Sequence, residues 1–541
     1  MPVKNKWQKC EWLMAILITL SCIILHLFFL FHAGGLWRDE VNLVNLAHFH
    51  SLGEMAKDSF PVLMPLLVKG WMTLLPVHGD FGIRILGTLI GVGIIAIMWL
   101  CALKIQRPPL WGLVLFGANA AVIYYGDSLR AYGLGCLLIL LAMTAMMFAL
   151  KKPDWWRCGA FSLAAILAVQ ALYQNAVFVA ALAAGGICVV CRRGDFVTAI
   201  KILIASSMAA LSLLPYFSQI HGLTTTHDPL RVGFSLYTAL ANCNQLVGWP
   251  QQFFSIIWIF LIYVMFCVLA VLTFFPRKNR LSLLTRNEHL LFACVTIIVA
   301  IVGYTAFLFL AGRRTEPWYF LPLAAIVAVC FDTGFSFLSL PKPIQTTAFG
   351  VIIVAAFLQI SHAPSHLSVR LTNVDQLARQ LRNTANRDDF VLVTPWFCGI
   401  SFDRYCGSSL HWQTIPFISD HSRHRYDLLQ EEMQNTEMLE PLFQRIKLTL
   451  QSGHDVWIVS ARTGIGVMSI PDGGRRCPSL LPPPLKESGW GEAPYCDNWA
   501  AVVAWFLKQN CSEFYEVTNA PTFEANHYEN LKLLVAAGWR G

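Results

Sequence analysis

The stretch that decides the fold runs from Glu11 to Glu40 and reads EWLMAILITLSCIILHLFFLFHAGGLWRDE. Residues 11 to 33 are almost uncharged and are long enough to cross the roughly 30 Å hydrocarbon core of a bilayer as a helix. Arg38, Asp39 and Glu40 follow almost directly. We expect a retained membrane helix, because the apolar stretch is too long for a signal peptide and no small-residue cleavage site precedes the acids.

The whole chain has the composition of an integral, multi-pass membrane protein. Of its 541 residues, 56% are hydrophobic and only 13% are charged, whereas ordinary globular domains carry about 25% charged residues. The apolar stretches predict about eleven transmembrane helices. They lie at residues 11–33, 82–103, 109–125, 129–150, 157–172, 175–191, 197–217, 252–275, 290–311, 317–338 and 345–361.

Basic residues predict the orientation, because short cytoplasmic loops are enriched in Lys and Arg. With a cytoplasmic amino terminus, every alternate loop is basic. These clusters are Lys4, Lys6 and Lys9, then Lys104 and Arg107, Lys151 to Arg157, Arg192 and Arg193, Arg277 to Arg286, and Lys342. An odd number of spans then places Asp39, Glu40 and everything after residue 362 on the outer face. The net charge of +8 is explained mostly by these loops and gives no indication of nucleic-acid binding.

The pattern changes near residue 362 and predicts two domains. Residues 1–362 are expected to form the membrane domain, with a first outer loop at 34–81, and residues 363–541 an extracytoplasmic soluble α/β domain. In the second domain, helices are predicted at 373–386, 426–451 and 498–508, and strands at 390–394 and 456–460. The stretch from 471 to 494 is rich in Pro and Gly and predicts a surface loop.

Cysteine and histidine spacing gives no metal motif. Pairs Cys398–Cys406 and Cys477–Cys496 would be compatible with disulfides in an oxidising compartment, but sequence does not fix connectivity. The histidines at 48, 50, 421 and 424 are loosely spaced for zinc and are interpreted as solvated side chains. Asp39 and Glu40 could hold a divalent cation, yet no further acidic ligand is near them in the sequence, so no obligatory metal or other cofactor is expected.

Several arginines lie at the predicted outer ends of spans, where the positive-inside rule does not expect them. They are Arg84, Arg130, Arg313 and Arg314. A guanidinium group offers a planar fork of donors that matches phosphate oxygens, so an anionic ligand at the outer surface would explain them. Snorkelling to lipid headgroups, or pairing with Asp127 or Glu316, is the alternative for each.

A carboxylate side chain beside a phosphate-binding site would suit the transfer of a sugar from a lipid phosphate. The phosphate of a lipid-linked sugar is a good leaving group that needs only charge stabilisation, whereas an acceptor hydroxyl benefits from a carboxylate base. One carboxylate suffices for single displacement with inversion. Adjacent helical residues point in different directions, so Asp39 could face the substrate while Glu40 caps the helix or holds a neighbour. Helix capping alone is the alternative for both acids.

Four stretches resemble one known family. They are LWRDEVNLVNLA (Leu36 to Ala47), FPVLMPLLVKGWMTLL (Phe60 to Leu75), YYGDSLRAYGL (Tyr124 to Leu134) and GRRTEPWYFLPL (Gly312 to Leu323). With the many-span core, they look like the GT-C membrane glycosyltransferases. The most similar branch is the PMT or glycosyltransferase 39 family, which groups protein O-mannosyltransferases with the lipid A aminoarabinose transferase.

This resemblance implies roles for particular residues. Asp39 matches the catalytic acidic position and Glu40 its supporting partner. Arg130 and Tyr132, and later Arg313, Arg314 and Tyr319, match the segments that bind the polyprenyl phosphate.

The chain also departs from the family pattern. Where the aminoarabinose branch has Lys-Pro-Pro, this chain has Ser59, Phe60, Pro61 and Val62. The basic ligand expected there is missing, so Arg84 or Lys69 would have to replace it, and Lys69 is equally explained as an interfacial anchor. The carboxy-terminal α/β domain also differs from the lumenal β-trefoil of eukaryotic mannosyltransferases, which leaves the acceptor open.

The sequence therefore predicts a glycosyltransferase of the cell envelope, located in the bacterial inner (plasma) membrane. It would transfer a hexosyl or pentosyl group from a polyprenyl-phosphate-linked sugar to a hydroxyl acceptor at the outer face. The alternatives are a transporter or flippase of lipid-linked intermediates, or a non-catalytic membrane scaffold. In the outer domain, aromatic residues such as Trp396 and Tyr426 lie among polar residues. They are expected either to stack on sugars or close over a cleft, or to pack this domain onto the membrane domain.

Overall fold

The computed structural model describes residues 6–56, 58, 60–75, 79–222, 233–274, 280–312, 314–335, 341–471, 476–484, 491–518 and 524–541. These residues form two compact units. The larger unit contains the described parts of 1–31, 51–224 and 233–368. The smaller unit joins His32–His50 to the described part of Val369–Gly541. The segment that carries Asp39 and Glu40 therefore belongs with the carboxy-terminal domain.

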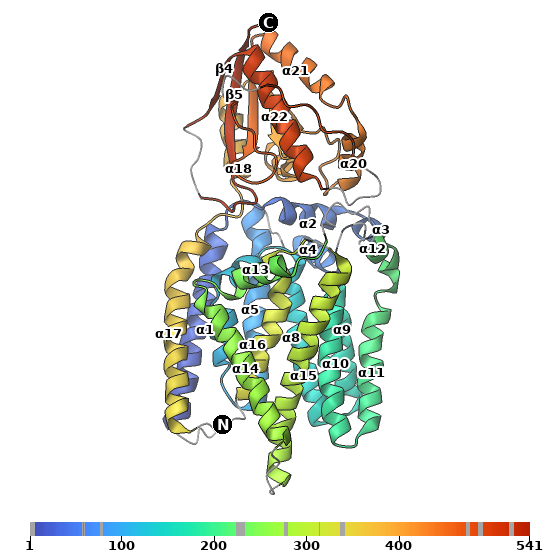
Figure 1. Cartoon of the computed structure of the whole chain (residues 1–541), viewed down its shortest axis with the longest axis vertical. Helices are drawn as coiled ribbons and strands as arrows, with labels where there is room; N and C mark the ends of the chain where they lie inside the picture. Colours follow the sequence, from blue (N-terminus) through green and yellow to red (C-terminus); the bar gives the residue numbers. More distant parts are fainter. Residues whose placement is uncertain are drawn as a thin grey trace. The chain divides into compact units, whose positions relative to one another are not determined.

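The larger unit is helical, and its long helices run side by side (Figure 1). Its helices are α1 (Lys6–His32), α3 (Leu52–Met55), α4 (Leu63–Leu74), α5 (Gly79–Ile105), α6 (Leu110–Gly112), α7 (Ala120–Gly126), α8 (Ala131–Lys151), α9 (Trp155–Ala171), α10 (Asn175–Arg192), α11 (Phe196–Leu211), α12 (Phe217–Gly222), α13 (Leu236–Val247), α14 (Phe253–Phe274), α15 (Arg280–Ala311), α16 (Leu321–Phe335) and α17 (Lys342–Leu367). Short 3-10 turns precede α12 and α16, at Leu214–Tyr216 (η2) and Pro317–Phe320 (η3).

In the described part of the chain, eight of these helices are long and apolar enough to cross a bilayer. They lie within α1, α5, α8, α10, α11–α12, α15, η3–α16 and α17. The polytopic helical fold expected from the sequence is thereby confirmed, while the number of eleven spans stays a prediction. The predicted spans at 157–172 and 252–275 coincide with α9 and α14.

The predicted span at 109–125 is broken. It consists of α6, a π-helical turn at Leu113–Gly117 (η1), and α7. Asn119 begins the second piece, because its Oδ1 atom accepts hydrogen bonds from the backbone N–H groups of Ala121 (2.9 Å) and Val122 (3.3 Å). An asparagine in this position caps a new helix. Apolar composition alone does not reveal such a break.

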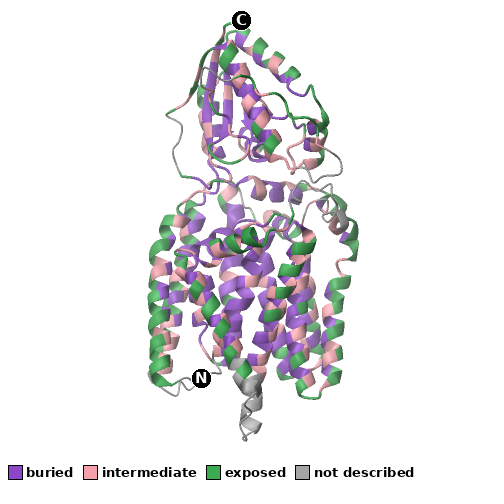
Figure 2. Cartoon of the chain, viewed as in Figure 1, coloured by how far each residue is buried: buried purple, intermediate pink, exposed green. Residues whose placement is uncertain are grey.

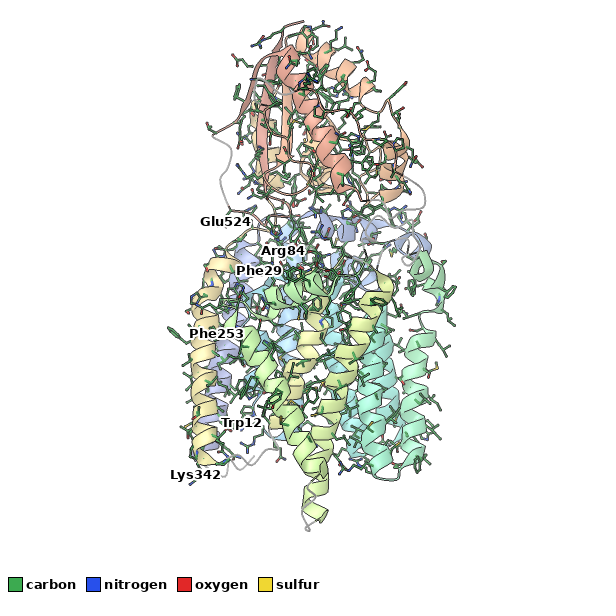
Figure 3. All side chains as sticks on the ribbon, viewed as in Figure 1. Trp12, Phe29, Arg84, Phe253, Lys342 and Glu524 are labelled. Atoms are coloured by element: carbon green, nitrogen blue, oxygen red, sulfur yellow. The ribbon has the colours of Figure 1, made fainter. Side chains whose placement is uncertain are left out.

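Some of the basic residues predicted to share one side lie within the described residues, and Arg277 and Lys278 lie outside them. Arg107 Nη1 pairs with Glu11 Oε2 at 3.1 Å, near the start of α1. Arg193 Nη1 donates to the carbonyl oxygen of Leu150 at 2.6 Å. Figure 3 places Lys342 at the end of the bundle that is opposite Arg84. These positions agree with the predicted alternation of basic loops, and the orientation in the membrane stays a prediction.

The smaller unit contains a five-stranded mixed sheet of order β2-β1-β3-β5-β4. Its strands are β1 (Phe390–Thr394), β2 (His411–Thr414), β3 (Val456–Ala461), β4 (Cys511–Glu516) and β5 (Leu531–Trp539). β1 pairs in parallel with both β2 and β3, and β5 runs antiparallel to β3 and β4. All five residues of β1 are buried, as expected for a strand covered on both faces.

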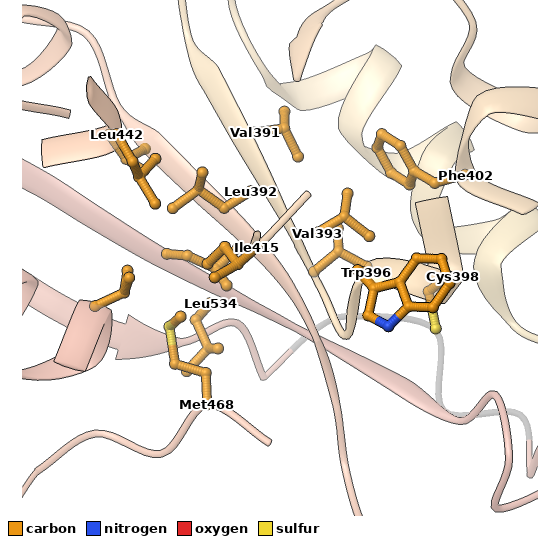
Figure 4. Close-up of a cluster of buried hydrophobic side chains, with 14 of the residues drawn as sticks. Val391, Leu392, Val393, Trp396, Cys398, Phe402, Ile415, Leu442, Met468 and Leu534 are labelled. Atoms are coloured by element: carbon orange, nitrogen blue, oxygen red, sulfur yellow. The ribbon is translucent and has the colours of Figure 1, made fainter. Parts of the chain in front are cut away.

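Helices cover this sheet. They are α18 (Val374–Thr384), α19 (Gly399–Cys406), α20 (Tyr426–Gln434), α21 (Glu440–Gln451) and α22 (Ala493–Asn510), with a 3-10 turn at Trp396–Cys398 (η4). Figure 4 shows Val391 and Val393 of β1 on the side of Phe402 and Trp396 and Leu392 on the side of Leu442, all in the buried core. Figure 2 shows the buried residues of the domain in purple, while the edge strands β2 and β4 are partly exposed. An α/β domain after the helical unit was expected and is confirmed.

The predicted helix at 426–451 is wrong, because the structure has two helices there. α20 ends at Gln434, and α21 begins at Glu440 with Pro441 in its first turn. Proline fits the first turn of a helix but not its interior, so Pro441 starts a new helix. β2, β4 and β5 were not predicted. The suggested disulfides are also absent from the described residues, where all sixteen cysteines are free thiols.

The segment His32–His50 is attached to the carboxy-terminal domain along its length. It contains α2 (Arg38–His48). The backbone N–H of Leu371 donates to the carbonyl oxygen of Ala33 at 2.9 Å. Gly34 forms a parallel bridge with Thr372, and the hydroxyl of Tyr405 donates to the carbonyl oxygen of Leu36 at 3.1 Å. These bonds fix where α2 begins.

Gly34 is essential to this attachment. Its φ is +77°, and a Cβ atom there would lie 2.4 Å from the guanidinium carbon of Arg370, which pairs with Asp375. Gly34→Ala is expected to weaken the attachment by about 2 kcal/mol, because alanine is strained at this φ and displaces Arg370. Limited proteolysis within 32–50 should then be about ten-fold faster or more. Gly53→Ala is the control, since nothing lies within 4 Å of its added Cβ, and equal rates would contradict the prediction.

Candidate functional site

Asp39 lies in the first turn of α2, where its carboxylate meets two basic side chains. Its Oδ1 atom is 3.2 Å from Nε2 of His424 and 3.7 Å from Nε of Arg38. The side chain of Asp39 is 20% exposed. Asp39 is therefore a partly exposed carboxylate that lies between two basic side chains.

Glu40 has different surroundings. It is completely buried, and its Oε2 atom accepts a hydrogen bond from the backbone N–H of Trp37 at 3.3 Å. This is the reciprocal half of a capping box, in which the third residue of a helix satisfies the residue before its first turn. The structure thus places the two acids in different positions: Asp39 near solvent and Glu40 inside, where it fixes the start of α2.

Arg38 connects α2 to the loop before β5. Its Nη1 atom donates to the carbonyl oxygen of Tyr528 at 2.6 Å, and its backbone N–H donates to Oε2 of Glu529 at 3.3 Å. The guanidinium carbon also lies 4.2 Å from the ring centroid of Phe397, within the range of a cation–π interaction. Arg38 is therefore held on several sides and cannot swing away from Asp39 without breaking these contacts.

Glu529 is fully buried beneath Arg38 and makes the stability of this unit depend on pH. Ser401 donates a hydrogen bond to its Oε1 atom at 2.6 Å. Burial raises the pKa of Glu529 from 4.5 to about 7, although the charge of Arg38 opposes the increase. Protonated Glu529 thus stabilises the folded unit. Because the folded-state pKa is the higher one, this contribution is complete below pH 4.5 and is lost as the pH rises through about 7.

We expect Glu529→Gln to reduce this pH dependence, because glutamine stays neutral and can still accept from Ser401. In the unmodified protein the contribution lost between pH 4.5 and about 7 should be about 3 kcal/mol. The apparent melting temperature, followed through the fluorescence of the smaller unit, should fall less over this interval in the variant. Glu524→Gln alters an exposed carboxylate of the same unit and serves as control. Parallel curves for all three proteins would contradict the assignment.

His424 stands between Asp39 and an aromatic cluster. Its ring lies 6.3 Å from that of Trp396, edge to face, and 6.1 Å from that of Tyr426, in a stacked arrangement. Its backbone N–H donates to Oδ1 of Asn42, one turn along α2, at 3.2 Å. Among the described residues, the buried Nδ1 atom has no hydrogen-bond partner. The ring is thus oriented by packing, with Nε2 directed at Asp39.

Trp396 and Tyr426, two of the aromatic residues singled out in the sequence, pack against each other within the smaller unit. Trp396 is 1% exposed and donates from Nε1 to Oε2 of Glu492 at 3.0 Å. Tyr426 lies edge to face against Trp396, with ring centroids 5.3 Å apart. These rings form the wall against which His424 packs.

A second group of predicted residues lies in the larger unit. Arg130 immediately precedes α8, and its guanidinium carbon lies 4.9 Å from the ring centroid of Tyr132 and 4.7 Å from that of Trp318. Tyr132 and Tyr319 are stacked, with centroids 5.7 Å apart. Phe60 meets Tyr132 edge to face at 5.6 Å. Stretches that are distant in the sequence thus meet around one arginine at the start of a long helix, a position that favours anions.

The remaining predicted arginines differ from one another. Arg314 is exposed and pairs with Oε1 of Glu316 at 3.2 Å, which agrees with the ion-pair alternative. Arg313 lies outside the described residues. Arg84 is only 1% exposed, so it does not extend to lipid headgroups. Its helix face also carries Gly87, where an added Cβ would lie 2.0 Å from the carbonyl oxygen of Asp127, and this face is directed at the turn that leads to Arg130.

Asp127 itself forms an unexpected pair. Its Oδ2 atom lies 2.7 Å from Nδ1 of His26 in α1, and both side chains are buried. Gly91 of α5 makes room for the pair, because a Cβ there would lie 2.0 Å from Oδ1 of Asp127 and 2.7 Å from Cε1 of His26. This contact joins α1, α5 and the turn between α7 and α8, and it orders the backbone that carries Arg130.

No group of three His, Cys, Asp or Glu side chains within the described ranges is placed to hold a metal ion. Asp39 and Glu40 do not share a coordination position, since the first faces His424 and the second caps its own helix. The need for a metal stays a matter for measurement.

The fold has counterparts of known structure. No model of a protein family and no curated protein sequence matches the chain. Its structure is similar to that of ArnT from Cupriavidus metallidurans bound to undecaprenyl phosphate, with a TM-score of 0.47 and 11% identity over 83% of this chain and 93% of that one.

The archaeal oligosaccharyltransferase AglB from Archaeoglobus fulgidus, in complex with an inhibitory peptide and a dolichol-phosphate, gives a TM-score of 0.48 and 9% identity over 84% of this chain and 70% of that one. Another structure of the Archaeoglobus fulgidus oligosaccharyltransferase, tethered to an acceptor peptide, gives 0.49 and 10% identity over 97% and 75%. The ligands named here belong to the matched proteins.

Three residues of the site were not predicted in the roles that the structure indicates: His26, His424 and Glu529. His26 was detectable, because a lone histidine inside an apolar span is rare and usually has a partner. His424 lay in a histidine-rich stretch that favoured a solvated interpretation, and its contact with Asp39 spans 385 residues of sequence. Glu529 follows a tyrosine in a polar turn and carries no local signal at all.

Proposed function

We propose that this protein is an inverting glycosyltransferase that moves a hexosyl or pentosyl group from a polyprenyl-phosphate-linked sugar to a hydroxyl acceptor. The observation that carries the proposal is the position of Asp39: partly exposed, hydrogen-bonded to His424, and set beside a Glu40 that is committed to capping. The resemblance of the four sequence stretches to the PMT family supports the same reaction. The proposed location is the outer face of a bacterial inner membrane, with the amino terminus in the cytoplasm.

In the proposed mechanism, Asp39 removes the proton from the acceptor hydroxyl as that oxygen attacks the anomeric carbon of the donor. A new carbon–oxygen bond forms, and the bond from the anomeric carbon to the lipid phosphate breaks. The phosphate leaves with the bonding electron pair and needs no proton. A single displacement of this kind inverts the anomeric configuration. His424 donates from Nε2 to one carboxylate oxygen of Asp39 and thereby orients the carboxylate of the proposed base.

Arg130 is proposed to bind the donor phosphate. It combines a charged fork of donors with the amino-terminal end of α8, whose backbone N–H groups and dipole favour an anion. The rings of Tyr132 and Trp318 limit the positions of its guanidinium group. Arg84, buried on the adjacent face of α5, is proposed to add positive potential there. Tyr319 holds Tyr132 by stacking.

The test is a transfer assay with the full-length protein in liposomes. Polyprenyl-phosphate-linked hexoses and pentoses are supplied as donors, with envelope glycolipids, glycans and peptides as acceptors. The proposal expects release of polyprenyl phosphate that depends on the acceptor, and a product of inverted configuration by NMR. A product of retained configuration would exclude single displacement. The absence of release with every donor would contradict glycosyltransferase activity.

A further inference from the structure

A cavity of about 430 Å³ opens in the smaller unit, where the end of α2 faces the segment Ser419–Ser422. From the α2 side it is lined by Asn45, His48 and Phe49, and from the other side by that segment and Asp403. Its volume lies within the range of sites that bind small molecules, about 300–1,000 Å³. Neither the proposed base nor the proposed phosphate site lines it.

The lining is polar and contains no Lys or Arg. It offers carboxylates, an amide, imidazoles and hydroxyl groups, which together both donate and accept hydrogen bonds. Asp420 is already engaged, because it accepts from the backbone N–H of Ser422 at 2.9 Å and pairs with Arg425. A phosphate group would meet carboxylates here, and the guanidinium group of Arg425 beside them is already paired with Asp420 and Asp427. Hydroxyl groups would find partners throughout.

The side chain of His421 lines the cavity and is held in place by its packing on neighbouring residues. Its ring packs on that of Trp412 with centroids 4.7 Å apart, and Gly399 lies so close that an added Cβ would be 2.6 Å from Nδ1 of His421. Burial lowers the pKa of His421 to about 4, although Asp420 opposes the decrease. The imidazole is therefore neutral at physiological pH and acts as both donor and acceptor.

The cavity adjoins the proposed base through two connections. Asn45 is six residues after Asp39 in α2, which is about 9 Å along the helix axis. Between them, Asn42 accepts from the backbone N–H of His424, the residue that contacts Asp39. The segment from 419 to 424 thus borders the cavity at one end and Asp39 at the other. A ligand that fills the cavity would lie within a sugar chain's reach of the base.

We propose that this cavity binds the acceptor, and that the acceptor is an uncharged, hydroxyl-rich saccharide. The inference rests on the proposed function, because it takes Asp39 as the base that the acceptor must reach. Carboxylate, amide and neutral imidazole groups pair with sugar hydroxyls, and the ring of Phe49 supplies an apolar face for a sugar ring. The cavity would hold the saccharide while one of its hydroxyl groups extends toward Asp39.

The test measures saccharide binding separately from transfer. The full-length protein in detergent is titrated with neutral trisaccharides of mannose and of N-acetylglucosamine, and with glucose 6-phosphate, by calorimetry. At least one neutral trisaccharide should bind, and the sugar phosphate should bind more weakly. The double variant Asn45→Ala/Asp403→Ala should raise the Kd by about ten-fold or more, since it removes two sets of hydrogen bonds. Asp388→Ala, an exposed carboxylate of the same unit that does not line the cavity, should leave the Kd within about two-fold.

Ser419→Tyr provides a second variant, because position 419 is exposed and a tyrosine there fills the cavity without removing a buried contact. It should also weaken binding and should raise the acceptor KM in the transfer assay. Absence of trisaccharide binding, or preference for the sugar phosphate, would overturn the inference. So would normal acceptor KM values in both cavity variants while transfer proceeds. If the trisaccharide binds in the cavity but no donor supports transfer, the glycosyltransferase proposal falls and the saccharide site stands.

Discussion

Asp39→Asn is expected to lower kcat for sugar transfer by about 10²- to 10⁴-fold, the usual contribution of a general base. Asparagine keeps the size of the side chain and can still accept from His424, but it cannot take a proton from the acceptor hydroxyl. Because Asp39 is partly exposed, the variant should fold normally. Donor affinity should also be retained, since the proposed phosphate ligands are elsewhere. The measurement is initial transfer rate at saturating donor and acceptor.

Glu40→Gln is the matched control for this substitution. Glutamine retains an oxygen that can accept from the backbone N–H of Trp37, so transfer should stay within several-fold of the unmodified rate. Full transfer by Asp39→Asn would remove the base assignment. A loss that is large for Glu40→Gln and small for Asp39→Asn would reverse the two roles.

His424 extends the same comparison. His424→Gln can place an amide donor near Asp39, whereas His424→Phe keeps the packing on Trp396 and Tyr426 without any donor. If His424 positions Asp39, the phenylalanine variant should lose more kcat than the glutamine variant and should show an altered pH profile, with little change in thermal stability. Equal rates and profiles for both variants would show that the contact has no part in the reaction.

Arg130→Ala is expected to weaken donor binding by about 10- to 100-fold, the range for a charge-assisted hydrogen bond to phosphate. Arg130→Lys should recover part of this affinity, because lysine restores the charge but not the planar fork. The measurement is the Kd for a polyprenyl phosphate titrated into the full-length protein in detergent. The acceptor KM should not follow the change.

Arg314→Ala is the control for Arg130. Arg314 is exposed and already paired with Glu316, and exposed ion pairs contribute about 0–1 kcal/mol. Its loss should change donor affinity by no more than about five-fold. Unchanged affinity after substitution of Arg130 would contradict the phosphate site, and a stronger effect at Arg314 would move that site to the loop before η3.

The main features of the fold follow from elementary patterns in the sequence. Long apolar stretches in the sequence predicted the helical bundle. The contact of Arg107 with Glu11 agrees with the prediction that the first two basic segments lie at the same end. Two short β-branched runs predicted β1 and β3. β2 was missed because HWQT is a short edge strand with little apolar character, and edge strands carry little burial signal.

The site was only partly predictable for a different reason. Resemblance and charge pointed to Asp39, Glu40, Arg130, Tyr132 and Tyr319 as candidates, since each lies in a recognisable local stretch, and their roles stay predictions. Their surroundings come from other parts of the chain: His424 approaches Asp39, and Trp318 and Phe60 approach Arg130 and Tyr132. The order of residues in the sequence does not by itself show which distant residues lie close together in the folded chain. The two acids also looked alike in sequence, and only burial separated the capping Glu40 from Asp39.

The compact unit that joins His32–His50 to residue 369 and beyond has a consequence for how this protein can be divided or recombined. A chain truncated after Ser368 would keep Asp39 but lose His424, Tyr405 and Glu529, and Trp37, which precedes α2, would lose its contact with Tyr528. If the carboxy-terminal domain were exchanged for that of a relative, residues 32–50 would have to be exchanged together with it. The carboxy-terminal domain and the segment that carries the proposed base therefore form one structural unit.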